Sequence, residues 1–265
     1  MNFYNNLFYL FTRKFLIFDK KIERKFNFSV FFLFPFRLIT RIIEKILFKP
    51  IKNLESKKEI SNYFVDFNKI KKKKSLNVIS IGVANNIDFD IELVKKFKIN
   101  KIIFIDPSNF SKIFVRNKIK NFKLKYHYEL KAMSINTKKK VKIFKAPYDL
   151  EPNWSLDNTF QSDTYILVDT IDYKYLIKKY KIKSLDILKL DAEGFADRIL
   201  LDILKCKILP EQICFELERP YSIFRQMSYF LRVYNLKKKL SIYYDIYFHT
   251  YLKIGMRIEL LAIKK

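Results

Sequence analysis

Two carboxylates, Asp191 and Glu193, lie at a position where a parallel α/β sheet binds its ligands. They follow the apolar run Leu185–Leu190, which predicts a buried strand, and they precede Phe195–Lys205, which has helical periodicity. Open α/β sheets bind ligands outside the carboxyl ends of their strands. An acidic pair there can accept a proton from a hydroxyl, orient an ammonium group or bind a cation. The alternative is that both residues only cap the following helix, whose dipole favours negative charge.

A second group of residues suits a nucleoside cofactor. Gly82 lies in the apolar run Asn77–Val83, where a backbone without a side chain allows close approach. Asp106 ends the next apolar run, Lys101–Ile105, and a carboxylate there can accept both hydroxyls of a ribose. Each residue alone also fits an ordinary turn or a helix cap, but the two together favour a nucleoside site.

The elements that position these residues alternate between strand and helix, which predicts a doubly wound, Rossmann-like α/β sheet. Seven strands are expected, mostly parallel and ending in an antiparallel hairpin with a tight connection at Gly255, over 77–83, 101–105, 124–133, 185–190, 212–217, 241–249 and 256–263. Helices are expected over 88–97, capped by Asn86 or Asp88, and over 108–120, capped by Ser108, and also over 172–180, 195–205 and 221–235. Short extended segments at 141–145 and 165–168 flank a loop over 146–162.

Composition narrows the class of protein. The formal net charge of +26 would suit nucleic acid or an anionic membrane, although an excess of Lys over Arg also follows from A/T-rich codons. The two Cys and two His show no metal-ligand spacing, so no metal site is expected. Unpaired cysteines fit a reduced, cytoplasmic location.

Residues 1–74 differ from the domain expected over 75–265. Two uncharged stretches of 11 residues, Asn2–Thr12 and Phe26–Phe36, are too short to span a bilayer. Apolar residues recur at helical spacing between basic ones, which suits a helix lying in a membrane interface, here the inner face of the membrane. The same faces could instead pack on the domain or form a homodimer. The run Lys71–Lys74 predicts a solvated linker before the domain.

Four segments of the chain match motifs of one known family. Asp186–Gly194, which reads DILKLDAEG, is similar to the DLLKIDVEG signature of the FkbM family of methyltransferases, and Val168–Asp172 resembles the VxTLD segment before it. Ala132–Ser134 resembles its ALS segment, and Ser80–Asp90 resembles a first motif of the form SxGVGxDxSFD. The similarity covers about residues 76–220, and Ala84 departs from it, because the family often has a second glycine there.

The resemblance implies S-adenosylmethionine as cofactor and O-methylation of a sugar or another small hydroxylated molecule. Asp191 and Glu193 are then the catalytic candidates, and the cofactor candidates are Gly82, Val83, Ala84, Asn85, Asp106, Pro107, Ser108 and Ser134. Trp154, an aromatic residue in the expected loop, and Glu216 and Glu218, at the end of the strand over 212–217, are candidates for the acceptor side.

Two other classes of protein remain. A nucleic-acid methyltransferase or basic binding module fits the charge, but the catalytic half has no NPPY-type motif and no basic stripe with regular aromatic spacing. A membrane-associated Rossmann protein without activity is the other, and Ala84 is its only indication.

Overall fold

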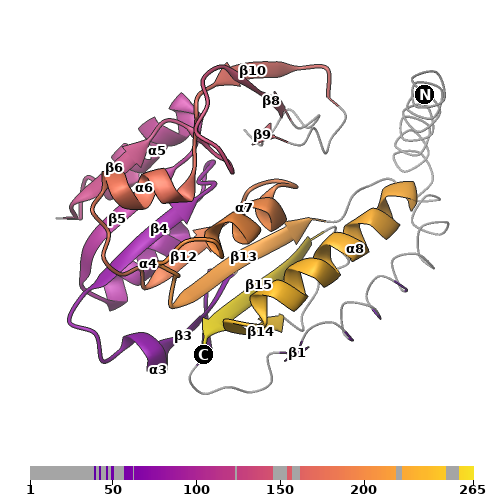
Figure 1. The fold of residues 1–265 in the computed structure, drawn as a ribbon. Coiled ribbons are helices and arrows are strands. Elements are labelled where there is room, and N and C mark those ends of the chain that lie inside the picture. Colours follow the sequence, from indigo (N-terminus) through magenta and orange to yellow (C-terminus); the bar gives the residue numbers. More distant parts are fainter. Residues whose placement is uncertain are drawn as a thin grey trace, which may run out of the picture.

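One large twisted sheet organises the chain (Figure 1). The computed structural model describes residues 39, 42, 46, 49–50, 57–61, 63–122, 124–145, 154–156, 162–218, 223–248 and 257–265. Within these ranges the main sheet contains, in spatial order, β1 (Lys49–Pro50), β14 (Tyr244–Phe248), β15 (Arg257–Lys264), β13 (Gln212–Glu218), β12 (Ile187–Leu190), β4 (Leu76–Ile81), β5 (Ile99–Ile105) and β6 (Tyr126–Glu129). The seven expected strands are therefore present, and the two-residue strand β1 extends the edge beyond β14.

The order of the strands places a ligand crevice in the middle of the sheet. β4 pairs in parallel with β5 on one side and with β12 on the other, so the chain reverses its direction of winding between β4 and β12. Such a switch point opens a crevice at the carboxyl ends of the strands. β15 pairs antiparallel with both β13 and β14, which confirms the expected final hairpin. Its connection, including Gly255, lies outside the described residues.

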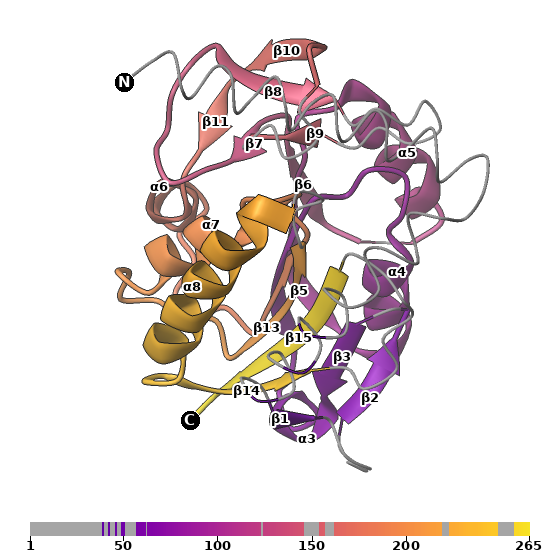
Figure 2. The ribbon, with the colours of Figure 1, turned by 90° about the vertical axis from the view of Figure 1, so that its right-hand side faces the viewer.

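Helices cover both faces of the sheet (Figure 2). α6 (Tyr173–Lys179), α7 (Ala196–Ile203) and α8 (Ile223–Leu240) cover one face, where Leu176, Leu200 and Val233 are buried with the strand residues. α4 (Asp88–Lys96) and α5 (Asn109–Ile119) cover the other face. Burial of both faces explains why the central strands are continuous apolar runs rather than alternating ones.

Of the two expected helix caps, the structure contains the one at α5 but not the one at α4. Ser108 caps α5, and its hydroxyl accepts from the backbone N–H of Ser111 at 3.4 Å. α4 has Ile87 at its cap position with no side-chain hydrogen bond, and Asn86 instead accepts from the Asp88 N–H at 2.8 Å. The cap expected from Asn86 or Asp88 is thus replaced by an Asn turn just before the helix.

Two smaller sheets lie where the parallel strands end. The strand expected over 124–133 divides into β6 and β7 (Ala132–Met133), because β7 leaves the main sheet to pair with β11 (Thr170–Ile171). β8 (Val141–Lys145) pairs antiparallel with β10 (Tyr165–Val168) and with β9 (Trp154–Ser155), a short strand inside the expected loop. These pieces stand above the crevice (Figure 1).

A hairpin also forms in the segment that the sequence assigns to a linker. β2 (Lys57–Ile60) and β3 (Tyr63–Asp66) pair antiparallel and lead into α3 (Phe67–Ile70). Gln212 of β13 holds the hairpin through both backbone groups of Asp66, accepting from its N–H at 2.7 Å and donating to its carbonyl at 2.8 Å. Ile60, Val65 and Ile70 are fully buried against the sheet. We infer that the folding unit includes residues 57–70.

Of the N-terminal pattern, the structure describes only Ile39, Ile42 and Ile46 with their side chains; the helical faces expected over residues 1–38 lie outside the described residues. These three isoleucines are helical, and each is at least half exposed. In the described part of the chain, no helix combines the length and the apolar character that crossing a membrane requires.

Candidate functional site

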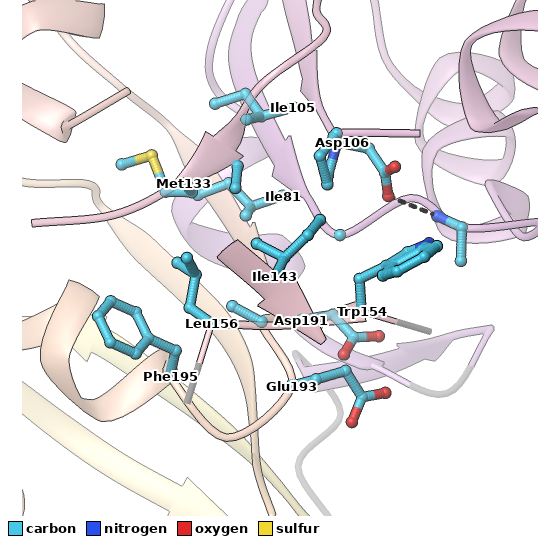
Figure 3. Close-up of a pocket in the computed structure, with 15 residues that line it drawn as sticks. Ile81, Ile105, Asp106, Met133, Ile143, Trp154, Leu156, Asp191, Glu193 and Phe195 are labelled. Carbon is cyan, nitrogen blue, oxygen red and sulfur yellow. Dashed lines mark hydrogen bonds between the residues drawn. The ribbon is translucent and has the colours of Figure 1, made fainter. Parts of the chain in front are cut away.

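A pocket opens at the carboxyl ends of β4, β5 and β12 (Figure 3). Its volume is about 640 Å³ including the open mouth. The polar part of its wall comes from Asp106 after β5 and from Asp191 and Glu193 after β12. Its apolar part comes from Ile81, Ile105, Ala132, Met133, Ile143, Leu156 and Phe195. In Figure 3, Asp191, Glu193 and the ring of Trp154 lie on one side of the pocket. Met133, Leu156 and Phe195 lie on the other side.

The turn after β4 brings its backbone against the turn after β12. Gly82 adopts a φ of +72°, and a Cβ built on it would lie 1.7 Å from the carbonyl oxygen of Asp191. No side chain of any size fits at this position. The buried ammonium of Lys189 donates to the carbonyl of Gly82 at 3.0 Å and holds the turn in place. The structure therefore explains Gly82 by the close approach of the two turns, and its role in binding a cofactor stays a prediction.

Ala84 is a point of strain in the same turn. Its φ of +45° lies in the left-handed region, which costs a residue with a Cβ about 1–2 kcal/mol. We expect Ala84→Gly to raise the free energy of unfolding by up to about 1 kcal/mol, because the greater freedom of glycine in the unfolded chain offsets part of the relief. Urea unfolding measures this change. A variant less stable than the parent would show that the Ala84 methyl makes contacts that outweigh the strain.

Asp106 organises the turn after β4 through backbone hydrogen bonds. One carboxylate oxygen accepts from the N–H groups of Val83 and Ala84, both at 3.0 Å, and the other accepts from the N–H of Ser108 at 2.8 Å. Burial raises the pKa of Asp106, and these hydrogen bonds oppose that shift. A carboxylate has about four lone-pair sites, and the Ser111 side chain also contributes a hydrogen bond that opposes the shift, so at most one site is left for a ligand. The sequence suggests two ribose hydroxyls at Asp106, whereas this geometry leaves room for about one.

We expect Asp106→Asn to weaken the binding of S-adenosylmethionine by roughly 5- to 150-fold, about 1–3 kcal/mol. In one orientation the NH₂ group of the amide faces the N–H groups of Val83 and Ala84, and both of these hydrogen bonds are lost. In the other orientation it faces the N–H of Ser108, and that hydrogen bond is lost. Calorimetry with the purified chain measures the change.

The matched control is Asp186→Asn at the opposite end of the sheet. Asp186 is also buried and also accepts from a backbone N–H, that of Asn77 at 2.7 Å. The Asp186→Asn change should lower the stability of the fold while leaving the cofactor affinity unchanged. Equal affinities for the parent and Asp106→Asn would remove Asp106 from the site.

Acidic groups crowd the ends of β12 and β13. Asp191 accepts a hydrogen bond at 3.2 Å from the hydroxyl of Tyr63, which belongs to the hairpin. Burial raises the pKa of Glu218 well above its ordinary value, and a hydrogen bond with Glu193 and the negative charges of Glu193, Glu216 and Asp191 raise it further. These causes favour the protonated form of Glu218, which can then donate the hydrogen bond to Glu193.

The Trp154 segment closes the acidic side of the pocket. Trp154 pairs with Lys145 of β8, and the hydroxyl of the next residue, Ser155, donates to the carbonyl of Glu193 at 2.6 Å. That bond ties the short strand β9 to the acidic turn. An aromatic face and a set of carboxyl groups therefore share one wall.

The other sequence candidates occupy distinct places. Gly82, Ala84, Asp106, Pro107, Trp154, Asp191 and Glu193 line the pocket. Val83 is buried beneath the turn, Asn85 is exposed, Ser108 caps α5, and the backbone N–H of Ser134 donates to the carbonyl of Ile171. The pocket lining does not include Glu216, which is buried, or Glu218, which lines a smaller cavity between α7 and α8.

Sequence reasoning did not identify Tyr63 or the apolar wall. The wall residues look like ordinary core residues in the sequence, and Tyr63 lies 128 positions before the acid that it contacts. Among the described residues, no group of three or more His, Cys, Asp or Glu is arranged to hold a metal ion.

Comparison with known proteins gives weak structural likenesses. No protein-family model and no curated protein matches the chain. The FkbM methyltransferase of Methylobacillus flagellatus is 15% identical with a TM-score of 0.45, over 71% of this chain and 44% of that one. The METTL16 methyltransferase domain is 11% identical with a TM-score of 0.44, over 74% and 61%. An O-methyltransferase of Bacillus cereus in complex with SAH is 12% identical with a TM-score of 0.43, over 72% and 75%. The chain thus spans less than two thirds of the first two.

Proposed function

We propose that this protein is an S-adenosylmethionine-dependent methyltransferase that methylates a hydroxyl of a sugar, a glycolipid or another small molecule. One observation carries the proposal. The turn after β4, the acid that holds it after β5 and an acidic pair after β12 meet around one pocket at the switch point of the sheet. A methyl-donating cofactor and a side chain that accepts a proton both need a position beside the same pocket.

The residues present suit this cofactor. Gly82 and Ala84 bring backbone into the wall of the pocket, and Ile105 and Met133 offer an apolar surface for a purine. The last acceptor site of Asp106 would bind one ribose hydroxyl.

S-adenosylmethionine supplies a methyl group on a positively charged sulfur. Transfer breaks the bond from sulfur to the methyl carbon, forms a bond from that carbon to the acceptor oxygen, and releases S-adenosylhomocysteine and a proton. Asp191 is proposed to accept this proton, with Glu193 supporting it. Alignment of the acceptor with the methyl group does most of the remaining work. Trp154 would hold the apolar face of a sugar ring.

The charge around the pocket favours an acceptor without phosphate at the reacting end. Asp191, Glu193, Glu216 and Glu218 place carboxyl groups at the ends of β12 and β13. A nucleic acid would bring phosphates towards these groups, which costs electrostatic energy. The net charge of +26 still favours a nucleic-acid acceptor as the alternative.

We also propose that residues 1–50 hold the protein at the inner face of a membrane, near lipid-linked acceptors. They contain ten basic and three acidic residues, and anionic lipids attract Lys and Arg by about 1 kcal/mol each. The exposed Ile39, Ile42 and Ile46 are spaced as one helical face. Flotation of the full chain with anionic liposomes at low salt, lost on deletion of residues 1–50, is the expected result. A chain that stays off the liposomes and forms a dimer that the deletion abolishes would contradict it.

Titration calorimetry of the full chain tests the cofactor directly. S-adenosylmethionine and S-adenosylhomocysteine should both bind at one site, and ATP should bind less tightly because the acidic side of the pocket repels its phosphates. Absence of binding by both adenosyl ligands, or a preference for ATP, would contradict the proposed function.

A further inference from the structure

Tyr63 reaches the pocket from the N-terminal hairpin. It is the first residue of β3, its side chain is 7% exposed, and its hydroxyl donates to one carboxylate oxygen of Asp191 at 3.2 Å. Phe89 of α4 holds the ring edge to face, with 5.5 Å between ring centres and 74° between ring planes. The hydroxyl is thus fixed by a packed ring and not by a flexible side chain.

The same ring contacts the group that supports the cofactor turn. The ammonium of Lys189 lies 5.4 Å from the centre of the Tyr63 ring and donates to the carbonyl of Gly82. A cation over an aromatic face is stabilised when water is excluded, and Lys189 is 5% exposed. Tyr63 therefore touches both the proposed proton acceptor and the support of the turn after β4.

A purely structural role of Tyr63 would not require the Asp191 carboxylate as the acceptor of its hydrogen bond. Tyr173 and Tyr244 are fully buried as well, and their hydroxyls donate to the backbone carbonyls of Ile208 and Pro210 at 3.0 and 2.9 Å. Tyr63 instead donates to a side chain that lines the pocket. Burial, and then the charges of Asp191, Glu216 and Glu259, raise the pKa of Tyr63 well above its ordinary value, so the hydroxyl keeps its proton.

We propose that Tyr63 is a positioning residue for Asp191, whose carboxylate it holds in one orientation. The inference rests on the proposed function, and it makes the hairpin over residues 57–66 part of the site. A donor that binds one oxygen of Asp191 leaves the other oxygen for the pocket. Loss of the hydroxyl should therefore let the carboxylate turn away from the pocket.

Several charged groups surround Asp191 and are kept unchanged in the test. They are Glu193 in the same turn, Lys189 of β12, Glu216 and Glu218 of β13, and Glu259 of β15. Tyr63→Phe removes only the hydroxyl and keeps the ring that faces Lys189 and Phe89. Tyr63→Met also lacks the hydroxyl and serves as the second variant if Tyr63→Phe does not fold.

The experiment measures the dissociation constants of S-adenosylmethionine and S-adenosylhomocysteine by calorimetry at neutral pH on the full chain. A carboxylate held beside the sulfonium favours the first ligand, which carries the positive charge. In Tyr63→Phe the binding curve of S-adenosylmethionine should shift to about tenfold weaker affinity, the scale of one lost hydrogen bond to a charged group, while the curve of S-adenosylhomocysteine stays in place. Tyr244→Phe is the matched control and should follow the parent.

Coincident curves for the parent and the folded Tyr63 variant would overturn the inference, and so would an equal shift in Tyr244→Phe. If the parent binds neither ligand, the proposed function fails and the role of Tyr63 fails with it. Binding by the parent with no shift in the variant would leave the proposed function intact and remove Tyr63 alone.

Discussion

Asp191→Asn should lower the rate of methyl transfer by roughly 100-fold or more, the usual scale for a positioned acid–base group. The amide has the size of the carboxylate and can still accept from the Tyr63 hydroxyl through its oxygen, so the fold and the turn should survive. It cannot take the proton of the acceptor hydroxyl. The rate is measured with S-adenosylmethionine labelled in the methyl group.

Asp245→Asn is the control for this variant. Asp245 lies on β14, near the far edge of the sheet and away from the pocket, and the same chemical change there should leave the rate unchanged. An Asp191→Asn rate within a factor of about two of the parent would sink the assignment, because that is far below the acid–base scale. A strong response of the parent to added Mg²⁺ or to a chelator would instead mark the acidic pair as a metal site.

Gly82→Ala should strongly weaken the binding of S-adenosylmethionine. The added Cβ would lie 1.7 Å from the Asp191 carbonyl oxygen, so one of the two turns must move. Overpacking of this kind costs roughly 1–3 kcal/mol, and the positive φ adds about 1–2 kcal/mol. If half of that sum, about 1–2.5 kcal/mol, falls on the bound state, the affinity drops by roughly 5- to 70-fold. Calorimetry on the full chain measures the loss.

The change in the opposite direction, Ala84→Gly, provides the comparison within the same turn. It should retain the affinity of the parent, since it removes a methyl group and relieves a φ of +45°. A Gly82→Ala protein that folds and binds S-adenosylmethionine like the parent would place the cofactor elsewhere. Thermal unfolding of each variant separates a loss of binding from a loss of fold.

The sequence predicts the central sheet well because the strands are buried on both faces. Segments such as Leu185–Leu190 and Lys101–Ile105 are apolar throughout apart from one or two polar residues, and the polar residues that follow them mark the strand ends. Asp106 and Asp191 could be selected for that reason, and both line the pocket. Their roles in the proposed reaction stay predictions.

The parts that could not be predicted depend on contacts between distant segments. Three of the four residues in the strand over Lys57–Ile60 are charged, and its intrinsic β propensity is low. It therefore looks like part of a basic linker until Gln212 and the buried Ile60 and Val65 fix it on the sheet. The three backbone donors to Asp106 likewise arise only when the turns after β4 and β5 meet. No periodicity in the sequence reports such contacts.

The proposed function is tested most directly by methyl transfer itself. The full chain is incubated with methyl-labelled S-adenosylmethionine and, in separate reactions, with carbohydrate, lipid-linked sugar and RNA pools, with Asp191→Asn and Gly82→Ala as blanks. We predict label in a carbohydrate or lipid-linked sugar, release of S-adenosylhomocysteine in equal amount, and little label in either blank. Label confined to RNA, or label in no pool from a chain that binds the cofactor, would contradict the proposed function.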